Sequence, residues 1–102
     1  MSLTGEEKQG QTCLKIEGSL SVYEVAELRE KILAYLEKNK DMILDLEEVT
    51  ECDTAGIQLL YSARKIAEEE GKTFTVTSAS DPVFEAITRI GLVSSDVLNL
   101  GG

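Results

Sequence analysis

Leu44-Asp45-Leu46-Glu47-Glu48-Val49-Thr50-Glu51-Cys52-Asp53-Thr54-Ala55-Gly56-Ile57 is the most informative stretch of the chain. It begins as the end of an apolar strand, passes through an acidic loop and continues as a helix that starts at Asp53 or Thr54. A helix start carries unpaired backbone N–H groups and the positive end of the helix dipole, so it favours negative charge. We therefore expect Asp53 to cap the helix. Thr54 would then place a hydroxyl at the helix start, where an added phosphate would meet the same field.

A purely structural interpretation of this stretch stays open at this point. Asp53 and Thr54 would then only cap a helix, and Gly56 would only permit close packing. Helix caps of this kind are common, so the residues alone favour this interpretation over a functional one.

Two strands and a helix are predicted on the N-terminal side of this stretch. Residues 12–17 alternate between apolar and polar side chains, which is typical of a half-buried strand. Ser21 and Glu24 form a capping-box pattern, and apolar residues at spacings of three and four follow it, so the sequence predicts an amphipathic helix over residues 22–39. Residues 42–46 form a short apolar run, which is typical of a central strand covered on both faces.

A helix, a strand and a further helix are predicted on the C-terminal side. The helix that starts at the Asp-Thr pair is expected to run to Glu70, just before a glycine. Residues 73–77 are β-branched and alternating, which indicates a strand. A third helix is predicted over residues 82–90, after an Asp-Pro pair and before Gly91.

The alternation of strands and helices predicts an α/β fold with one domain. We expect a four- to five-stranded, mostly parallel or mixed β-sheet with helices packed on it. Residues 1–11 are polar and unpatterned over most of their length, so they are expected to form a flexible lead-in to a domain over residues 12–102. The residues expected in the core are Ile16, Leu28, Ile32, Ile43, Leu44, Leu60, Ala63, Val76 and Ile87.

The composition argues against several classes of ligand and function. The 102 residues include 19 acidic and 10 basic side chains, for a net charge of −9. This charge disfavours nucleic acid and anionic lipid as ligands and suits a basic protein surface. The chain has no histidine, and we find no metal-ligand cluster and no phosphate-binding loop, so we expect neither enzymatic activity nor a cofactor.

Other features of the sequence point to location and assembly. No apolar run is long enough to span a membrane and no secretory leader is evident, so we expect a cytoplasmic protein without membrane insertion. No heptad repeat is present, which favours a monomer or weak dimer. Cys13 and Cys52 lie in apolar, strand-like surroundings and are expected to be buried thiols.

Several segments resemble the signature of STAS domains, the anti-sigma-factor-antagonist family. In that family an Asp-Leu strand end leads through a short loop to Asp-Ser/Thr-Ser/Ala-Gly-Leu/Ile at a helix start. Each motif is weakly specific, but together and in this order they are fairly specific. The segments that carry the resemblance are Gly18-Ser19-Leu20, Asp45-Leu46, Val49, Asp53-Thr54-Ala55-Gly56-Ile57, Glu70-Gly71-Lys72 and the run from Pro82 through Gly91-Leu92.

The resemblance implies a regulatory binding module. In bacterial antagonists of this family, the hydroxyl residue after the motif aspartate is phosphorylated by a partner serine/threonine kinase that is also an anti-sigma factor. The dephosphorylated form binds that kinase and frees the sigma factor. Carried over, the resemblance implies phosphorylation of Thr54 and partner switching. The residues expected to bind the partner or form the switch are Asp45, Glu47, Asp53, Thr54, Ala55 and Gly56.

The sequence departs from the sporulation and stress antagonists at two positions. Thr54 stands where serine is common, and Ala55 stands where a second hydroxyl is frequent. This pair is similar to other branches of the family, which implies an alternative function. The chain would then be a constitutive accessory subunit of a phospholipid-transport-type ABC system, with Thr54 as an interface residue, or part of a chemotaxis-type signalling complex.

Overall fold

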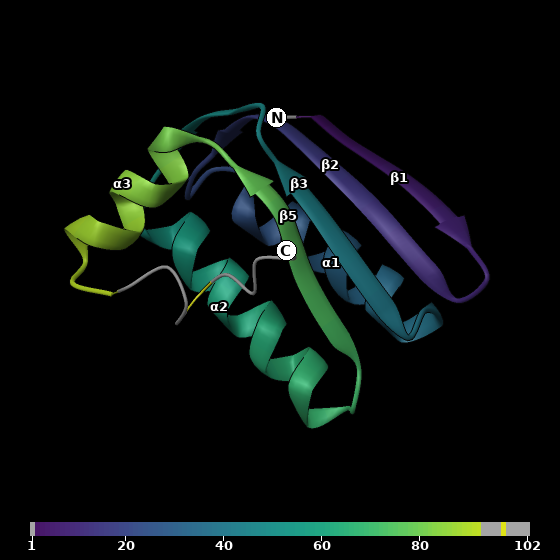
Figure 1. The fold of residues 1–102 in the computed structure, drawn as a ribbon. Helices are drawn as coiled ribbons and strands as arrows, with labels where there is room; N and C mark the ends of the chain where they lie inside the picture. Colours follow the sequence, from purple (N-terminus) through teal and green to yellow (C-terminus); the bar gives the residue numbers. More distant parts are fainter. Residues whose placement is uncertain (1, 93–96, 98–102) are drawn as a thin grey trace.

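The computed structural model describes residues 2–92 and Val97. Strands and helices alternate along most of this range (Figure 1). The elements are β1 (Ser2–Lys8), β2 (Gln11–Leu20), α1 (Val25–Lys38), β3 (Asp41–Leu46), β4 (Val49–Cys52), α2 (Thr54–Glu69), β5 (Thr73–Ala79) and α3 (Asp81–Arg89). None of the helices in the described part has both the length and the apolar character that a membrane crossing requires.

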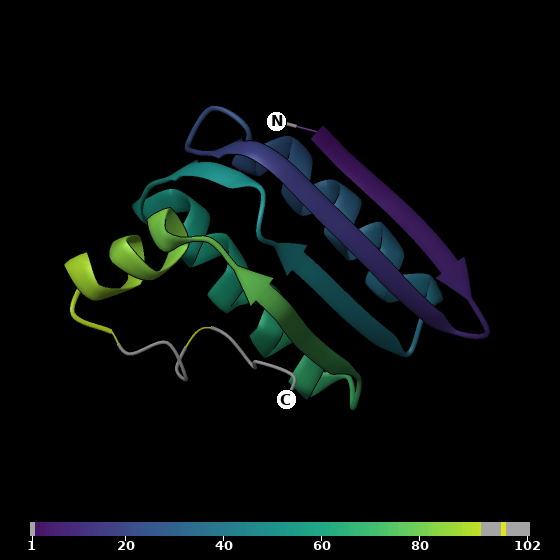
Figure 2. The same ribbon diagram turned by 45° about the horizontal axis from the view of Figure 1, so that its top comes forward.

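The strands form one five-stranded mixed sheet, which confirms the predicted α/β class. The strand order is β1-β2-β3-β5, and β4 pairs with the end of β2. The pairing of β1 with β2 is antiparallel, whereas β2–β3, β2–β4 and β3–β5 are parallel. The parallel arrangement brings the ends of β2, β4 and β5 and the starts of α2 and α3 to one end of the sheet, as Figures 1 and 2 show.

Helices α1 and α2 cover one face of the sheet, and no helix within residues 2–92 covers the opposite face, the open face (Figures 1 and 2). The burial pattern of β3 follows from this layering. Met42, Leu44 and Leu46 are buried, while the residues between them are only half-buried. The expectation that this strand is covered on both faces is therefore wrong, and Ile43, predicted to be a core residue, lies on the open face.

The other predicted core residues are confirmed. They lie in a single hydrophobic cluster between the sheet and the helices. Those residues are Ile16, Leu28, Ile32, Leu44, Leu60, Ala63, Val76 and Ile87, each no more than 2% exposed.

The N-terminal segment differs from the expectation of a flexible lead-in, because Ser2–Lys8 is strand β1. It pairs along its whole length with β2, from Ser2 opposite Glu17 to Lys8 opposite Gln11. Most of its side chains are exposed, so no apolar alternation marks it in the sequence. Its order comes from backbone pairing and from one packed side chain, Leu3. Edge strands of this kind leave a weak sequence signal because burial is what creates the alternating pattern.

Helix α1 begins three residues later than the capping-box pattern predicts. The Ser21 hydroxyl donates to the Glu24 carboxylate instead of bonding the helix backbone. The backbone N–H groups of Glu24 and Val25 both donate to the Ser21 carbonyl, at 3.0 and 3.1 Å. Residues 21–24 therefore form a turn that enters the helix at Val25.

Candidate functional site

Asp53 caps helix α2, as the sequence predicts. Its backbone is extended, with φ −111° and ψ −177°, and its Oδ1 atom accepts a hydrogen bond from the Gly56 N–H at 3.1 Å. The Asp53 carbonyl accepts the first helical bond, from the Ile57 N–H at 3.2 Å. One side chain thus satisfies an otherwise unpaired N–H donor in the first turn of the helix.

The second carboxylate oxygen of Asp53 bonds a distant part of the chain. Its Oδ2 atom accepts from the backbone N–H of Val22 at 3.0 Å. The Asp53 N–H in turn donates to the carbonyl of Leu20 at 3.2 Å. Asp53 therefore joins three structures: the end of β2, the turn that leads into α1, and the start of α2.

Thr54 is the first residue of α2 and is exposed. Its hydroxyl has no hydrogen-bond partner among residues 2–92 and 97. Thr54 lies at the positive end of the α2 dipole, and the first turn of α2 contains no acidic side chain beyond the Asp53 cap. A phosphate on Thr54 would meet backbone N–H groups and not a buried apolar surface.

Gly56 is required for the close approach of α2 to β2. A methyl group built on its Cα would lie 2.6 Å from the Leu20 carbonyl oxygen and 2.8 Å from the Leu20 Cγ. Either distance is far shorter than a van der Waals contact. Glycine therefore lets the first turn of α2 rest on the end of β2, while Ala55 beside it is half-buried. The purely structural interpretation of the sequence gives Gly56 this packing role, and the short distances to Leu20 agree with it.

Cys52 lies beneath this turn, and its thiol has low reactivity near neutral pH. The pKa of its thiol is raised to about 11, mainly by burial and also by the negative charge of Asp53, and these two effects outweigh the lowering by the positive charge of Arg89. A thiol with this pKa stays protonated near neutral pH and is a poor nucleophile. Arg89 lies in the last turn of α3.

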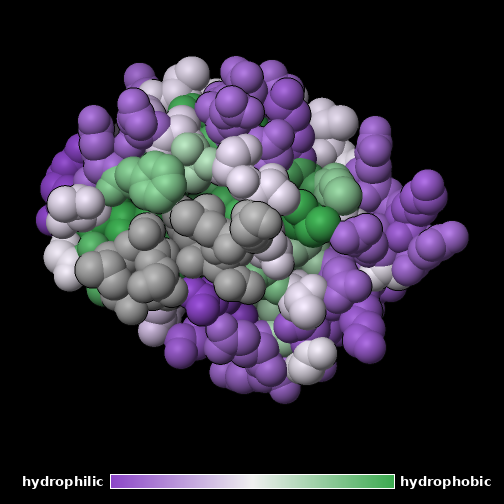
Figure 3. All heavy atoms as spheres, in the orientation of Figure 1, coloured by the Kyte–Doolittle hydropathy of each residue, from purple (hydrophilic) through white to green (hydrophobic). Residues whose placement is uncertain are grey.

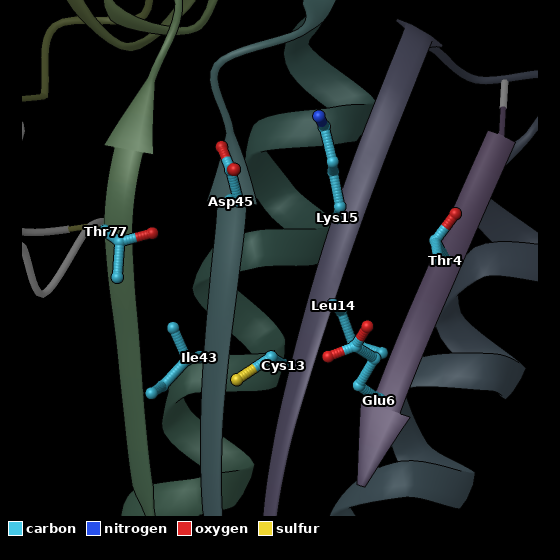
Figure 4. A pocket seen from close by; sticks show the side chains of 8 residues that line it. All are labelled: Thr4, Glu6, Cys13, Leu14, Lys15, Ile43, Asp45 and Thr77. Carbon is cyan, nitrogen blue, oxygen red and sulfur yellow. The ribbon is translucent and has the colours of Figure 1, made fainter.

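Asp45 lies near the end of β3, and the hydrogen bonds of its side chain within the described residues go to Glu47 and Ser78, not to the start of α2. The side chain of Asp45 lies on the open face of the sheet (Figure 4), where its Oδ1 atom accepts bonds from the Glu47 N–H at 3.0 Å and the Ser78 hydroxyl at 3.1 Å. Glu47 is exposed in the turn between β3 and β4. Asp53, Thr54, Ala55 and Gly56 thus lie together at the start of α2, whereas Asp45 accepts a hydrogen bond within the turn that precedes β4.

The open face of the sheet carries a shallow hollow of about 330 Å³. Figure 4 shows side chains from four strands pointing out of this face, with Cys13 and Ile43 between polar neighbours. In Figure 3 green atoms lie over the middle of this face among purple ones. Cys13 is exposed here, so the expectation that it is a buried thiol is wrong. Side chains along β2 alternate between the two faces of the sheet, and Cys13 lies on the face away from the helices.

The sequence interpretation missed one component of the site, the turn over residues 21–24. Val22 and Tyr23 are exposed, at 58% and 93% of their surface. The sequence contains a signal for this exposed turn. Val22 and Tyr23 lie between the capping-box residues Ser21 and Glu24, outside the apolar positions that form the buried face of the helix. The described residues contain no group of three or more Cys, Asp or Glu side chains arranged to hold a metal ion.

Comparison with known proteins agrees with this architecture. The family model described as "Mlab, STAS domain" matches residues 4–99. The Anti-sigma-B factor antagonist of Bacillus subtilis (strain 168) is 22% identical over 102 residues, which span 98% of this chain and 92% of that protein.

Two solved structures are similar in fold. SpoIIAA from Bacillus in its phosphorylated form has a TM-score of 0.74 at 15% identity, covering 99% of this chain and 92% of that one. An RsbS variant from Moorella thermoacetica has a TM-score of 0.77 at 19% identity, covering 100% and 89%. At these identities the two structures support the fold alone.

Proposed function

The chain belongs to the STAS domain family, and from this premise we propose that it is a regulatory protein-binding module of the anti-sigma-factor-antagonist type. Its partner is a serine/threonine kinase that also acts as an anti-sigma factor. Phosphorylation of Thr54 by that kinase ends the binding, and the unphosphorylated chain binds again. The surface that carries the switch is the start of α2, from Asp53 to Gly56.

The observation that carries this proposal is the position of Thr54. Its hydroxyl is exposed, has no partner among the described residues and follows the aspartate that caps α2. A kinase therefore has access to it without unfolding the domain. The similarity to an anti-sigma-B factor antagonist supports the same role.

Electrostatics explain how a phosphate at Thr54 would work as a switch. Phosphorylation adds a charge of roughly −1.5 to −2 at neutral pH. The start of α2 tolerates that charge because its dipole and N–H groups favour anions, so the domain stays folded. A partner surface shaped for a neutral hydroxyl would instead meet added bulk and charge. Binding is lost at the interface while the fold is retained.

The proposal is tested with purified kinases. Each anti-sigma-factor kinase encoded by the organism that encodes this chain is mixed with wild type, Thr54→Ala or Thr54→Glu, and binding is measured by surface plasmon resonance. We expect one kinase to bind both wild type and Thr54→Ala. The same kinase should bind Thr54→Glu at least tenfold more weakly, because a charge placed in an interface costs about 1.4 kcal/mol or more of binding free energy, and each 1.4 kcal/mol is a tenfold change in affinity. Incubation with ATP should add one phosphate to wild type and none to Thr54→Ala.

Two outcomes would contradict the proposal. Equal binding of wild type and Thr54→Glu, with no phosphate on Thr54, would instead indicate a constitutive interface. Binding of no kinase at all would remove the partner class. Circular dichroism of each variant serves as the control that the fold is intact.

A further inference from the structure

The turn between β2 and α1 exposes two large apolar side chains beside the start of α2. Tyr23 is 93% exposed and Val22 is 58% exposed. Among the residues that the structure describes, Tyr61 is the one other exposed large hydrophobic residue, at 38%, and its ring lies 5.4 Å from the Lys65 ammonium. Tyr23 has no comparable cover. Exposed aromatic residues of this kind are enriched among the residues that dominate protein interfaces.

The turn is held in place by hydrogen bonds on both sides. Within the turn, the N–H groups of Glu24 and Val25 donate to the Ser21 carbonyl, and the Ser21 hydroxyl donates to the Glu24 carboxylate. Across the molecule, the Val22 N–H donates to Asp53. The backbone that carries Tyr23 is thus fixed before any partner arrives. A preorganised loop loses less conformational entropy on binding than a mobile one, so its apolar side chains contribute more to affinity.

Asp53 places this turn next to the proposed switch. The oxygen atom that bonds Val22 and the one that caps α2 belong to the same carboxylate, and Thr54 is the next residue along the chain. Tyr23 and Thr54 therefore lie on two segments that are both hydrogen-bonded to the Asp53 carboxylate. A partner that distinguishes phosphorylated from unphosphorylated Thr54 can therefore also contact Tyr23.

The charges around the turn indicate the chemistry of that partner. Glu48 and Glu51 are exposed next to the end of β2, where Glu51 pairs with Ser19 and the Glu48 carbonyl accepts from Gly18. Across residues 2–92 and 97 the salt bridges join Glu27 to Lys31 and Glu68 to Arg64, so they leave both acids unneutralised. An apolar side chain that follows a strand end flanked by two unneutralised carboxylates is complementary to an apolar pocket with a basic rim.

We propose that Tyr23, with Val22, is the apolar anchor of the kinase-binding surface, held beside Thr54 by the Asp53 carboxylate. The partner supplies an apolar pocket for the Tyr23 ring and Lys or Arg side chains around it. This inference rests on the proposed function, because it names a further part of the same interface. It adds a contact segment 31 residues before the motif aspartate, one that the sequence motif does not contain.

The test uses the kinase that binds wild type in the experiment above. Its affinity is measured for wild type, Tyr23→Ser, Tyr23→Phe and Thr54→Glu. We expect Tyr23→Ser to bind on the order of 30-fold more weakly, as is typical when an aromatic anchor is truncated. Tyr23→Phe keeps the ring and should bind within about threefold of wild type. Because Tyr23 is almost fully exposed, both variants should unfold at the wild-type urea concentration.

The outcomes separate the two proposals. If the kinase binds wild type, rejects Thr54→Glu and binds Tyr23→Ser as well as wild type, the anchor is refuted while the proposed function stands. If Tyr23→Ser and Tyr23→Phe weaken binding equally, the ring is not the anchor and the inference also fails. If no kinase binds wild type, both proposals fail together. Loss of binding that is specific to Tyr23→Ser supports the anchor.

Discussion

The carboxylate of Asp53 accepts a hydrogen bond from the backbone N–H of Val22 at 3.0 Å, across 31 positions of the chain. The same side chain caps α2 through the Gly56 N–H at 3.1 Å. A residue that the motif marks as a helix cap is therefore also a tertiary link between the first helix and the second. Its substitution affects two helix starts at once.

Replacing Asp53 by alanine should lower the free energy of unfolding by about 1–2 kcal/mol, the usual range for losing a helix cap. The lost bond to Val22 places the effect toward the upper end of that range. Asp53→Asn is the matched control, because asparagine also caps helices well and should lose less. Urea denaturation measures both variants. If Asp53→Ala were as stable as Asp53→Asn, the carboxylate would not have the linking role described here.

Replacing Gly56 by alanine should destabilise the chain by about 1–3 kcal/mol, as overpacking typically does. The added methyl group would meet the Leu20 carbonyl at 2.6 Å, so α2 would have to move away from β2. Gln58→Ala, an exposed position on the same helix, should change stability by no more than about 0.5 kcal/mol. Equal urea midpoints for these two variants would disprove the close approach.

Charge at Thr54 should change stability only slightly and in opposite directions for opposite signs. Thr54→Glu places a carboxylate at the positive end of the α2 dipole, whereas Thr54→Lys places a cation there. We expect the two variants to differ by about 0.5–1 kcal/mol in favour of glutamate at low ionic strength. The difference should shrink in 1 M NaCl because salt screens the interaction. A lysine variant that is the more stable of the two would contradict this electrostatic account.

The two cysteines should react at very different rates. Cys13 is exposed on the open face of the sheet, whereas the Cys52 thiol is partly buried and its pKa is raised to about 11. At pH 8 only about one in a thousand Cys52 thiols is ionised, since each pH unit below the pKa reduces the thiolate tenfold. Iodoacetamide labelling followed by mass spectrometry should modify Cys13 first. Labelling of Cys52 should accelerate as the pH approaches 11, and in urea both should react readily.

Deletion of residues 1–8 should destabilise the domain, because Ser2–Lys8 is a paired strand and Leu3 packs against the core. We expect the melting temperature to fall by several degrees, which is about 1 kcal/mol or more for a domain of this size. Hydrogen exchange by NMR gives the independent check. Amides of β1 that bond β2 should be protected from exchange in the intact chain. If these amides exchanged as fast as those of an unstructured peptide, the interpretation of residues 1–11 as a flexible lead-in would be correct instead.

The elements predicted correctly from the sequence are those with a buried face. Helix α2 and strand β5 each bury several side chains at regular spacing, so the apolar pattern marks them. The apolar pattern does not mark strands β1 and β4, because β1 buries almost no side chain and β4 buries one, Val49. Their existence depends on backbone pairing with β2, which leaves no pattern in the side chains.

The site was predicted in part for the same reason. The cap formed by Asp53 and the packing of Gly56 are local features, so neighbouring residues reveal them. The family resemblance places Asp45 with the site through the Asp45-Leu46 strand end. The alternation of side chains along β3 puts Asp45 on the open face, and a register shift between β3 and β5 brings Ser78 opposite it, where the Ser78 hydroxyl donates to it. The contact between Val22 and Asp53 depends on the parallel pairing of β2 with β4, a tertiary arrangement that no local pattern indicates.

The one-sided sheet gives the domain a hydrophobic layer shared by helices α1, α2 and α3. No helix can leave that layer without uncovering side chains on which the others depend, so the chain should melt as one cooperative unit. A protein that binds only the folded chain therefore protects every element and not the contact surface alone. At a free concentration of 100 times its Kd, such a partner raises the free energy of unfolding by about 2.7 kcal/mol. Because of this thermodynamic linkage, gain or loss of the partner changes the fraction of the whole domain that is unfolded at equilibrium.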